Sequence, residues 1–450
     1  MFFSQNQLKW LEQIFFERFG IKFNFELTQE TIVLKKEGSD KKLIFTNLDS
    51  AFYQFGKTQL GCYEWNAETE GLVGAIDPVL KAPSTKPLST PIFSPVEQDI
   101  YVNYDVLGLV YWCLNRLEEV GRTDLDNHQR FPAIHSHAYH YNYLERPIVD
   151  EWLNILGQII QQVWLEVELK QHTFNMKVSH DVDSPSPYAF KSWGEVLRIM
   201  IGHLVKRHDM KAFIETFWIK FATKEQLHEY DPHNTFDWLM QQSNANNLTS
   251  AFYFICGGTT DKDAEYTLAH PVIQKLMQHI HQNGHEIGLH PSYATYQAPE
   301  LIQQEADNLR YACEQAGIDQ TTFGGRMHYL RWEHPTTLQA WENAGMSYDS
   351  TLSYADRPGF RCGTCFEYPA FNPMTQQSLN IRIRPLIAME CTIIDPIYLG
   401  LNVTPQAENK FLELKDKCRR VSGCFTTLWH NSYFKKNEML KGMYQRIIES

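Results

Sequence analysis

The stretch Val178-Ser179-His180-Asp181-Val182-Asp183 ends a predicted β-strand and leads into Ser184-Pro185-Ser186-Pro187. Side chains alternate between the two faces of a strand, so Asp181 and Asp183 point the same way if the strand continues through them. Two carboxylates on one side of a buried strand repel, and the pKa of one rises unless a cation lies between or beside them. A metal ion resolves that conflict. Alternatively, one carboxylate binds the metal and the other acts as a base beside it. The alternative is a solvated turn that caps the strand, and this stretch alone does not decide.

From about residue 172 onward, segments typical of strands alternate with segments typical of helices. The predicted strands are 173–180, 249–256, 285–290, 321–328, 346–351, 381–387 and 424–429, and the predicted helices between them include 264–283, 298–316 and 334–344. Such alternation indicates a parallel α/β sheet or barrel. Seven strands with intervening helices suit a β/α barrel-like domain.

Polar residues gather at the carboxyl ends of five of these strands. They are Asp181 and Asp183, His290, Arg326 and His328, Asp349, and His430. In parallel barrels the active site forms at that rim from residues far apart in sequence. Each residue alone also has a structural explanation: His290 as a turn histidine, Arg326 as an ion-pair residue, His430 as a core histidine bonded to backbone. Together they favour an active site.

These residues resemble the motifs of a known group. Ser179–Asp183, Gly284–His290, Arg326, Tyr348–Ser350 and Leu428–His430 follow, in order, the motifs of the polysaccharide deacetylase superfamily, the NodB-homology domain of carbohydrate esterase family 4-like proteins. The resemblance covers residues 172–440. The details at 288–293, 326–332 and 354–361 look like a bacterial subgroup associated with surface-polysaccharide gene clusters, and residues 1–170 look like the N-terminal domain of that subgroup.

The resemblance implies a deformed (β/α) barrel that removes an acetyl group from an N-acetylated sugar or glycan precursor with the help of a divalent metal, expected to be Zn²⁺. By position, Asp181 is then the general base and Asp183 the carboxylate metal ligand. His290 is a histidine ligand, Arg326 orients or charges the base, and His430 is the general acid. These residue types suit metal-assisted amide hydrolysis.

One position departs from the family pattern. The usual second histidine ligand, four residues after His290, is replaced by Ala294. We predict His328 as the third ligand, with His285 a poorer candidate because it lies on the other strand face. The departure leaves two alternatives open: a catalytically impaired glycan-binding protein on the same fold, and a hydrolase of another amide, such as a cyclic imide.

A chain of 450 residues is expected to form two or three domains. We predict an N-terminal α+β domain of unknown role at 1–170 and the barrel at 171–450. The first contains a predicted helix at 5–19, strands at 31–34 and 43–45, a proline-rich break at 81–91, and helices at 105–117 and 147–169. The sequence does not indicate the oligomeric state.

Composition bears on the class of partner and on the cellular compartment of the protein. The net charge of −12 argues against a generic nucleic-acid binder. The N-terminal stretch lacks the features of a secretory signal, and no apolar run suggests a membrane span. Nine cysteines, an odd number, predict reduced thiols and a cytoplasmic protein. The pair Cys362 and Cys365 has no second Cys-Xaa-Xaa-Cys, which favours a structural role over a zinc or redox site.

Overall fold

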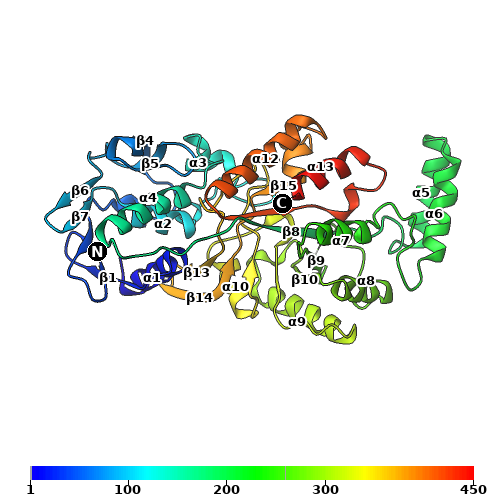
Figure 1. Ribbon diagram of the computed structural model, residues 1–450. Helices are drawn as coiled ribbons and strands as arrows, with labels where there is room; N and C mark the ends of the chain where they lie inside the picture. The colour runs from blue at the N-terminus through cyan, green and yellow to red at the C-terminus, as the bar shows by residue number, and fades with distance from the viewer. Residues whose placement is uncertain (1–2, 259, 450) are drawn as a thin grey trace.

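The computed structural model describes residues 3–258 and 260–449, and its N-terminal part is a mixed α/β structure (Figure 1). Helix α1 (Gln5–Phe19) precedes a five-stranded sheet of order β1-β2-β3-β7-β6. These strands are β1 (Phe23–Leu27), β2 (Ile32–Lys36), β3 (Lys42–Phe45), β6 (Phe93–Val96) and β7 (Asp99–Val102). A separate hairpin pairs β4 (Gly61–Asn66) with β5 (Val79–Ser84). Helices α2 (Val106–Leu114), α3 (His137–His140) and α4 (Ile148–Val163) complete this part.

The proline-rich segment 81–91 connects these two sheets. Pro83 lies within β5, which is half of a two-stranded sheet and has a free edge. Proline is tolerated there because no further strand needs its missing N–H. The segment then crosses to β6, so its prolines mark a connection inside the N-terminal part.

A second sheet contains nine strands in the order β13-β14-β12-β11-β10-β9-β8-β16-β15. They are β8 (Asn175–Val182), β9 (Ala251–Ile255), β10 (Glu286–His290), β11 (Gly324–Gly325), β12 (Tyr348–Asp349), β13 (Tyr368–Asn372), β14 (Gln377–Ile383), β15 (Ala388–Met389) and β16 (Cys424–Leu428). All neighbours pair in parallel except β13 with β14. The predicted parallel α/β arrangement is confirmed. Across the described residues, the hydrogen-bonded order is open, with β13 and β15 at its edges.

Helices alternate with these strands. They are α5 (Trp193–Lys206), α6 (Met210–Ala222), α7 (Phe236–Ala245), α8 (Pro271–Gln282), α9 (Pro299–Gln315), α10 (Thr336–Asn343), α11 (Glu390–Ile394), α12 (Pro405–Arg420) and α13 (Glu438–Ile448). Every residue of β9 is buried, as expected for a strand covered on both faces. Among the described helices, none combines the length and the apolar character required to cross a bilayer.

Two predicted strands are much shorter than expected. Segments 321–328 and 346–351 contribute only two residues each, as β11 and β12. The glycines explain the close packing there: a Cβ at Gly325 would lie 1.9 Å from the carbonyl oxygen of Leu289, and one at Gly324 would lie 2.1 Å from the ring of Tyr348. Strand β11 ends at Gly325, so Arg326 follows at the carboxyl edge of the sheet.

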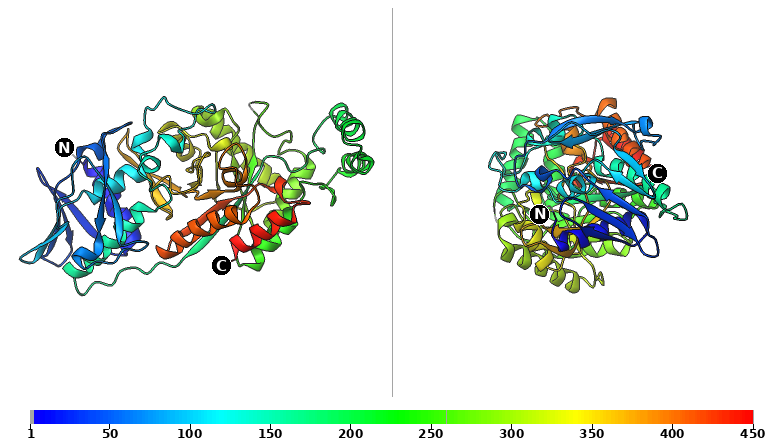
Figure 2. Two further views of the ribbon diagram at one scale, coloured as in Figure 1. Left: turned by 90° about the horizontal axis from the view of Figure 1, so that it is seen from above. Right: turned by 90° about the vertical axis from the view of Figure 1, so that its left-hand side faces the viewer.

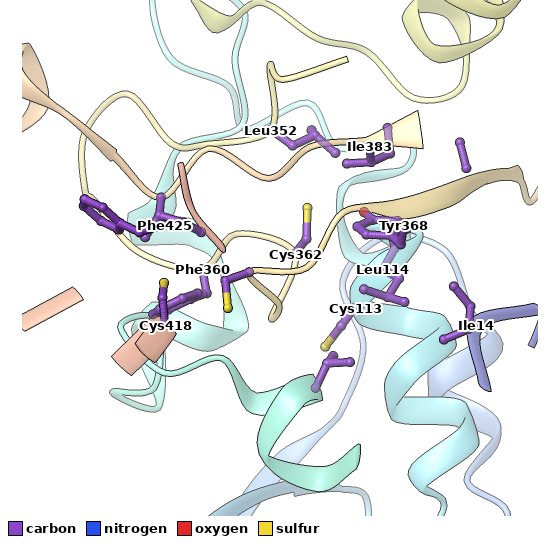
Figure 3. Packing of buried hydrophobic residues seen from close by; sticks show 14 of the residues in the cluster. Ile14, Cys113, Leu114, Leu352, Phe360, Cys362, Tyr368, Ile383, Cys418 and Phe425 are labelled. Atoms are coloured by element: carbon purple, nitrogen blue, oxygen red, sulfur yellow. Dashed lines mark hydrogen bonds between the residues drawn. The ribbon is translucent and has the colours of Figure 1, made fainter. Parts of the chain in front are cut away.

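The N-terminal part and the nine-stranded sheet share one hydrophobic core. Figure 3 shows Ile14 of α1 and Leu114 of α2 in the same cluster as Tyr368 and Ile383 of β13 and β14. The indole N–H of Trp10 also donates to the carbonyl oxygen of Pro369, at 2.9 Å. All nine cysteines are free, and Cys362 and Cys365 are both buried.

A buried ion cluster reinforces the same junction. Arg361 donates to both carboxylate oxygens of Glu119, at 3.0 and 2.6 Å, and Arg116 donates to one of them at 2.9 Å. Burial raises the pKa of Glu119, but Arg361 and Arg116 outweigh it and lower the pKa from 4.5 to about 2. The carboxylate therefore stabilises the fold above pH 4.5, and this contribution is lost as the pH falls towards 2.

We expect Glu119→Gln to lower the free energy of unfolding by about 3–5 kcal/mol at neutral pH, because the buried guanidinium of Arg361 loses its countercharge and Arg116 keeps only Glu118, at 2.6 Å. Urea unfolding measures this. The difference from the unmodified protein should shrink as the pH falls below 4.5. Glu413→Gln is the matched control: its carboxylate pairs with Lys410 at 3.4 Å on the surface, and its loss should cost at most about 1 kcal/mol. Equal effects of the two changes would contradict the role of the cluster.

Candidate active site

The structure brings the sequence-predicted residues together at one edge of the nine-stranded sheet. Asp181 lies near the end of β8 and Asp183 follows its last residue, while His290 ends β10. Arg326 follows β11, and His430 comes shortly after β16. Because β8, β10, β11 and β16 run in parallel, their carboxyl ends meet at the same edge. His290 Nε2 lies 3.7 Å from an oxygen of Asp181 and 3.2 Å from one of Asp183, so both carboxylates face the same histidine.

Asp181 has a cation directly beside it. Arg326 Nη1 donates to its Oδ1 at 2.7 Å, and both side chains are almost completely buried. The same guanidinium donates to Ser179 Oγ at 2.9 Å and to the carbonyl oxygen of Ser350 at 3.0 Å. Arg326 is therefore held in place from three directions and supplies the positive charge that a buried carboxylate requires.

Asp183, His290 and His328 form a group of three possible metal ligands. Asp183 Oδ1 lies 3.2 Å from His290 Nε2 and 3.8 Å from His328 Nε2. Ligand atoms at the usual Zn–N and Zn–O distances in a tetrahedral shell lie about 3.4 Å apart. Asp183 Oδ1 is buried and accepts no hydrogen bond within the part of the chain that the structure describes. An unsatisfied buried carboxylate oxygen facing two imidazoles fits a divalent cation.

The other nitrogen of each of these imidazoles is occupied. His290 Nδ1 lies 2.6 Å from the carbonyl oxygen of Arg326, which can only accept, so Nδ1 carries the proton. His328 Nδ1 lies 3.0 Å from a carboxylate oxygen of Asp263. These contacts leave the Nε2 lone pair of each histidine available to a cation beside Asp183. Partners on the second ring nitrogen orient metal-binding histidines in this way. The residues present thus fit Zn²⁺ with three protein ligands.

Without a cation, the charges in this group compensate one another. Burial lowers the pKa of His328, but Asp183 and Asp263 outweigh it and raise the pKa to about 9. Burial likewise raises the pKa of Asp183, but the positive charge of His328, with the neighbouring imidazoles of His290 and His430, outweighs burial and brings the pKa well below its usual range. The site therefore favours positive charge next to Asp183, whether from a proton or a metal.

His430 faces the other carboxylate oxygen of Asp183, with its Nε2 3.5 Å from Oδ2. Its Nδ1 is 2.5 Å from Glu390 Oε1, a fully buried carboxylate at the start of α11. Burial lowers the pKa of His430, but Glu390 outweighs it and raises the pKa well above the usual value. Cys391 Sγ lies 3.7 Å from the same Nδ1. His430 is therefore poised to hold a proton on the nitrogen that faces the site.

Other residues considered from the sequence are not part of the site. His285 is buried, and its Nδ1 accepts the backbone N–H of Ser250 at 3.1 Å. It precedes β10, so it lies at the opposite end of that strand from His290. Asp349 accepts the backbone N–H of Thr351 at 2.8 Å and caps the loop after β12. Ala294 comes directly before the short helix Thr295–Gln297.

Sequence reasoning missed three contributors: Asp263, Glu390 and the segment that contains His128. The segment belongs to the N-terminal part and lies against the rim. His128 Nδ1 is 3.0 Å from the hydroxyl of Tyr293, and Arg130 donates to the carbonyl oxygen of Tyr329 at 2.8 Å. Tyr329 follows His328 directly, so residues 126–130 lie beside the proposed metal ligand His328. Glu390 directly follows β15, but that strand is only two residues long and leaves little signal in the sequence.

Comparison with known proteins gives a family match for the N-terminal part and distant structural neighbours that cover 62% of the chain. Residues 4–165 match the model of a family of unknown function, DUF7033. No curated protein sequence matches the chain significantly. Among solved structures, a Mycobacterium smegmatis protein assigned as a polysaccharide deacetylase is 16% identical with a TM-score of 0.39, covering 62% of this chain and 85% of that one. The Puue allantoinase is 12% identical with a TM-score of 0.35, covering 62% and 83%. At such low identity and TM-scores, neither structure decides what this chain does.

Proposed function

We propose that this protein is a metal-dependent hydrolase of a carbon–nitrogen amide bond, built on a deformed (β/α) barrel, and that its substrate is the N-acetyl group of an amino sugar in a surface-polysaccharide precursor. The observation that carries the proposal is the group of Asp183, His290 and His328, with the unsatisfied oxygen of Asp183 at its centre. A candidate base and a candidate acid next to that group support hydrolysis: Asp181 lies 3.7 Å from His290 Nε2, and His430 Nε2 lies 3.5 Å from Asp183. The order of the motifs supports the sugar substrate.

The chain supplies the groups that such a reaction needs. Asp183, His290 and His328 would hold the cation. A bound divalent ion lowers the pKa of water and polarises an amide carbonyl. Asp181, paired with Arg326, accepts the proton of the attacking water. His430, kept protonated by Glu390, donates a proton to the departing amine nitrogen.

The two alternative functions are a non-catalytic glycan-binding protein and a hydrolase of cyclic imides. A non-catalytic glycan-binding protein was favoured by Ala294, but the distance of 3.8 Å between His328 Nε2 and Asp183 Oδ1 supports His328 as the third ligand. Hydrolysis of a cyclic imide would use the same residues in the same roles, so only a comparison of substrates separates it from deacetylation.

The test combines metal analysis with a substrate panel. We expect stoichiometric zinc by elemental analysis of the purified protein and release of acetate from N-acetylated amino sugars, offered free, nucleotide-linked and as oligomers. Hydantoin and dihydrouracil serve as cyclic amides in parallel. Ring opening without acetate release would retain the hydrolase and reject the sugar substrate. Absence of metal and of both activities after reconstitution with Zn²⁺ would reject the proposal.

A further inference from the structure

Helices α5 and α6 form a hairpin that projects away from the rest of the molecule. Figures 1 and 2 show it at the end of the molecule opposite the N-terminal sheet. The two helices bury only a narrow seam between them, which includes Val196, Met200 and Ile219. The hairpin follows β8 and Asp183, and Lys436, shortly after His430, pairs with Glu215 at 3.5 Å. It is thus attached to two of the segments that form the site.

The outer face of this hairpin is strongly apolar. Ten of the 23 large apolar side chains that are exposed among the described residues belong to it: Trp193, Leu197, Ile201, Leu204, Val205, Met210, Ile214, Phe217, Trp218 and Phe221. In each helix they recur at intervals of three and four residues, which places them on one stripe. The rings of Trp193 and Phe217 lie 6.0 Å apart, so the stripes of the two helices join. A continuous exposed apolar surface of this kind marks an interaction site.

The charge of the hairpin is opposite to that of the whole protein. Residues 193–224 contain six Lys and Arg and three Asp and Glu, whereas the chain as a whole carries a net charge of −12. Lys206, Arg207 and Lys211 are all exposed and flank the turn between the helices. Helices with an apolar stripe rich in Trp and Phe beside basic residues bind the interface of a bilayer. Two copies of the hairpin would instead bring like charges together.

We propose that the α5–α6 hairpin docks on an anionic lipid surface, with its aromatic stripe in the headgroup region and its basic turn on lipid phosphates. This inference rests on the exposed stripe and its charge, and it does not depend on the proposed hydrolase activity.

Co-sedimentation of the full chain with vesicles tests the proposal. We expect binding to phosphatidylcholine vesicles that contain phosphatidylglycerol, weakening at high salt, and little binding to phosphatidylcholine alone. The triple variant Phe217→Ser, Trp218→Ser, Phe221→Ser should bind about 100-fold more weakly. The triple variant Lys206→Gln, Arg207→Gln, Lys211→Gln should also lose about 100-fold, because each basic residue near an anionic surface contributes about fivefold.

Matched controls change the same chemistry elsewhere. Val73, Leu165 and Ile397 are exposed apolar residues outside the hairpin, and Lys9, Lys22 and Lys57 are exposed cations outside it. Their triple substitution to Ser or to Gln should leave vesicle binding unchanged, and circular dichroism checks that every variant folds. Failure to bind anionic vesicles, or equal loss in the controls, would overturn the proposal. Sedimentation velocity that shows a dimer abolished by the aromatic substitutions would assign the surface to a second copy instead.

Discussion

Replacing His328 with alanine is expected to lower the affinity for Zn²⁺ at least about 100-fold, since the loss of even an outer partner of a ligand costs 10–100-fold. His328 Nε2 faces Asp183 Oδ1, and Asp263 fixes the ring through Nδ1. Without it, Asp183 and His290 are the only two protein ligands left in the group, too few for the usual three of a catalytic zinc site. Competition with a chromophoric chelator measures the affinity, and hydrolytic activity should fall in parallel.

His285→Ala is the matched control for this prediction. Both histidines are buried, and His285 was the other candidate for the missing ligand, but its Nδ1 accepts the backbone N–H of Ser250. We expect its replacement to leave metal affinity unchanged and at most to lower stability. Loss of zinc in His285→Ala but not in His328→Ala would contradict the assignment.

The parallel sheet was predictable because its strands are buried on both faces and appear in the sequence as apolar runs. Ala251–Ile255 is such a run, and the prediction 249–256 contains it. The hairpin at Trp193–Ala222 was not predicted, since apolar side chains occur both on its inner seam and on its outer stripe, and no single face stands out. Strands β5 and β6 were missed because they contain Pro83 and Pro95, residues that ordinarily argue against a strand.

The site was predicted where its residues follow clear apolar runs, and it was missed where they follow a two-residue strand, as Glu390 does, or lie in loops. Asp183, His290 and His430 each stand at the end of an apolar run, and the parallel sheet brings such ends together. Asp263 lies in a loop before α8, and its contact with His328 depends on how that loop folds back. His128 reaches the rim from the N-terminal part, across a junction that no local pattern indicates. Long-range packing decides both positions.

Replacing Asp181 with asparagine is expected to lower the rate of hydrolysis by a factor of about 10²–10⁴ while zinc remains bound, because the change removes the general base and leaves the ligand group intact. Steady-state kinetics and elemental analysis of the same preparation measure both quantities. The buried guanidinium of Arg326 loses its partner charge, so the free energy of unfolding should fall by about 3–5 kcal/mol, and assays belong well below the unfolding temperature.

Asp349→Asn separates a catalytic effect from the general cost of changing a buried carboxylate at this edge of the sheet. Burial raises the pKa of Asp349 to about 6, and its contacts are with Thr351 outside the ligand group. We expect this variant to retain both zinc and most activity. If Asp181→Asn also loses zinc, Asp181 is a ligand as well as, or in place of, the base; if it retains activity, the base lies elsewhere. Activity lost equally in both variants would show that the rim tolerates no change of charge, and Asp181 would have no special part in the reaction.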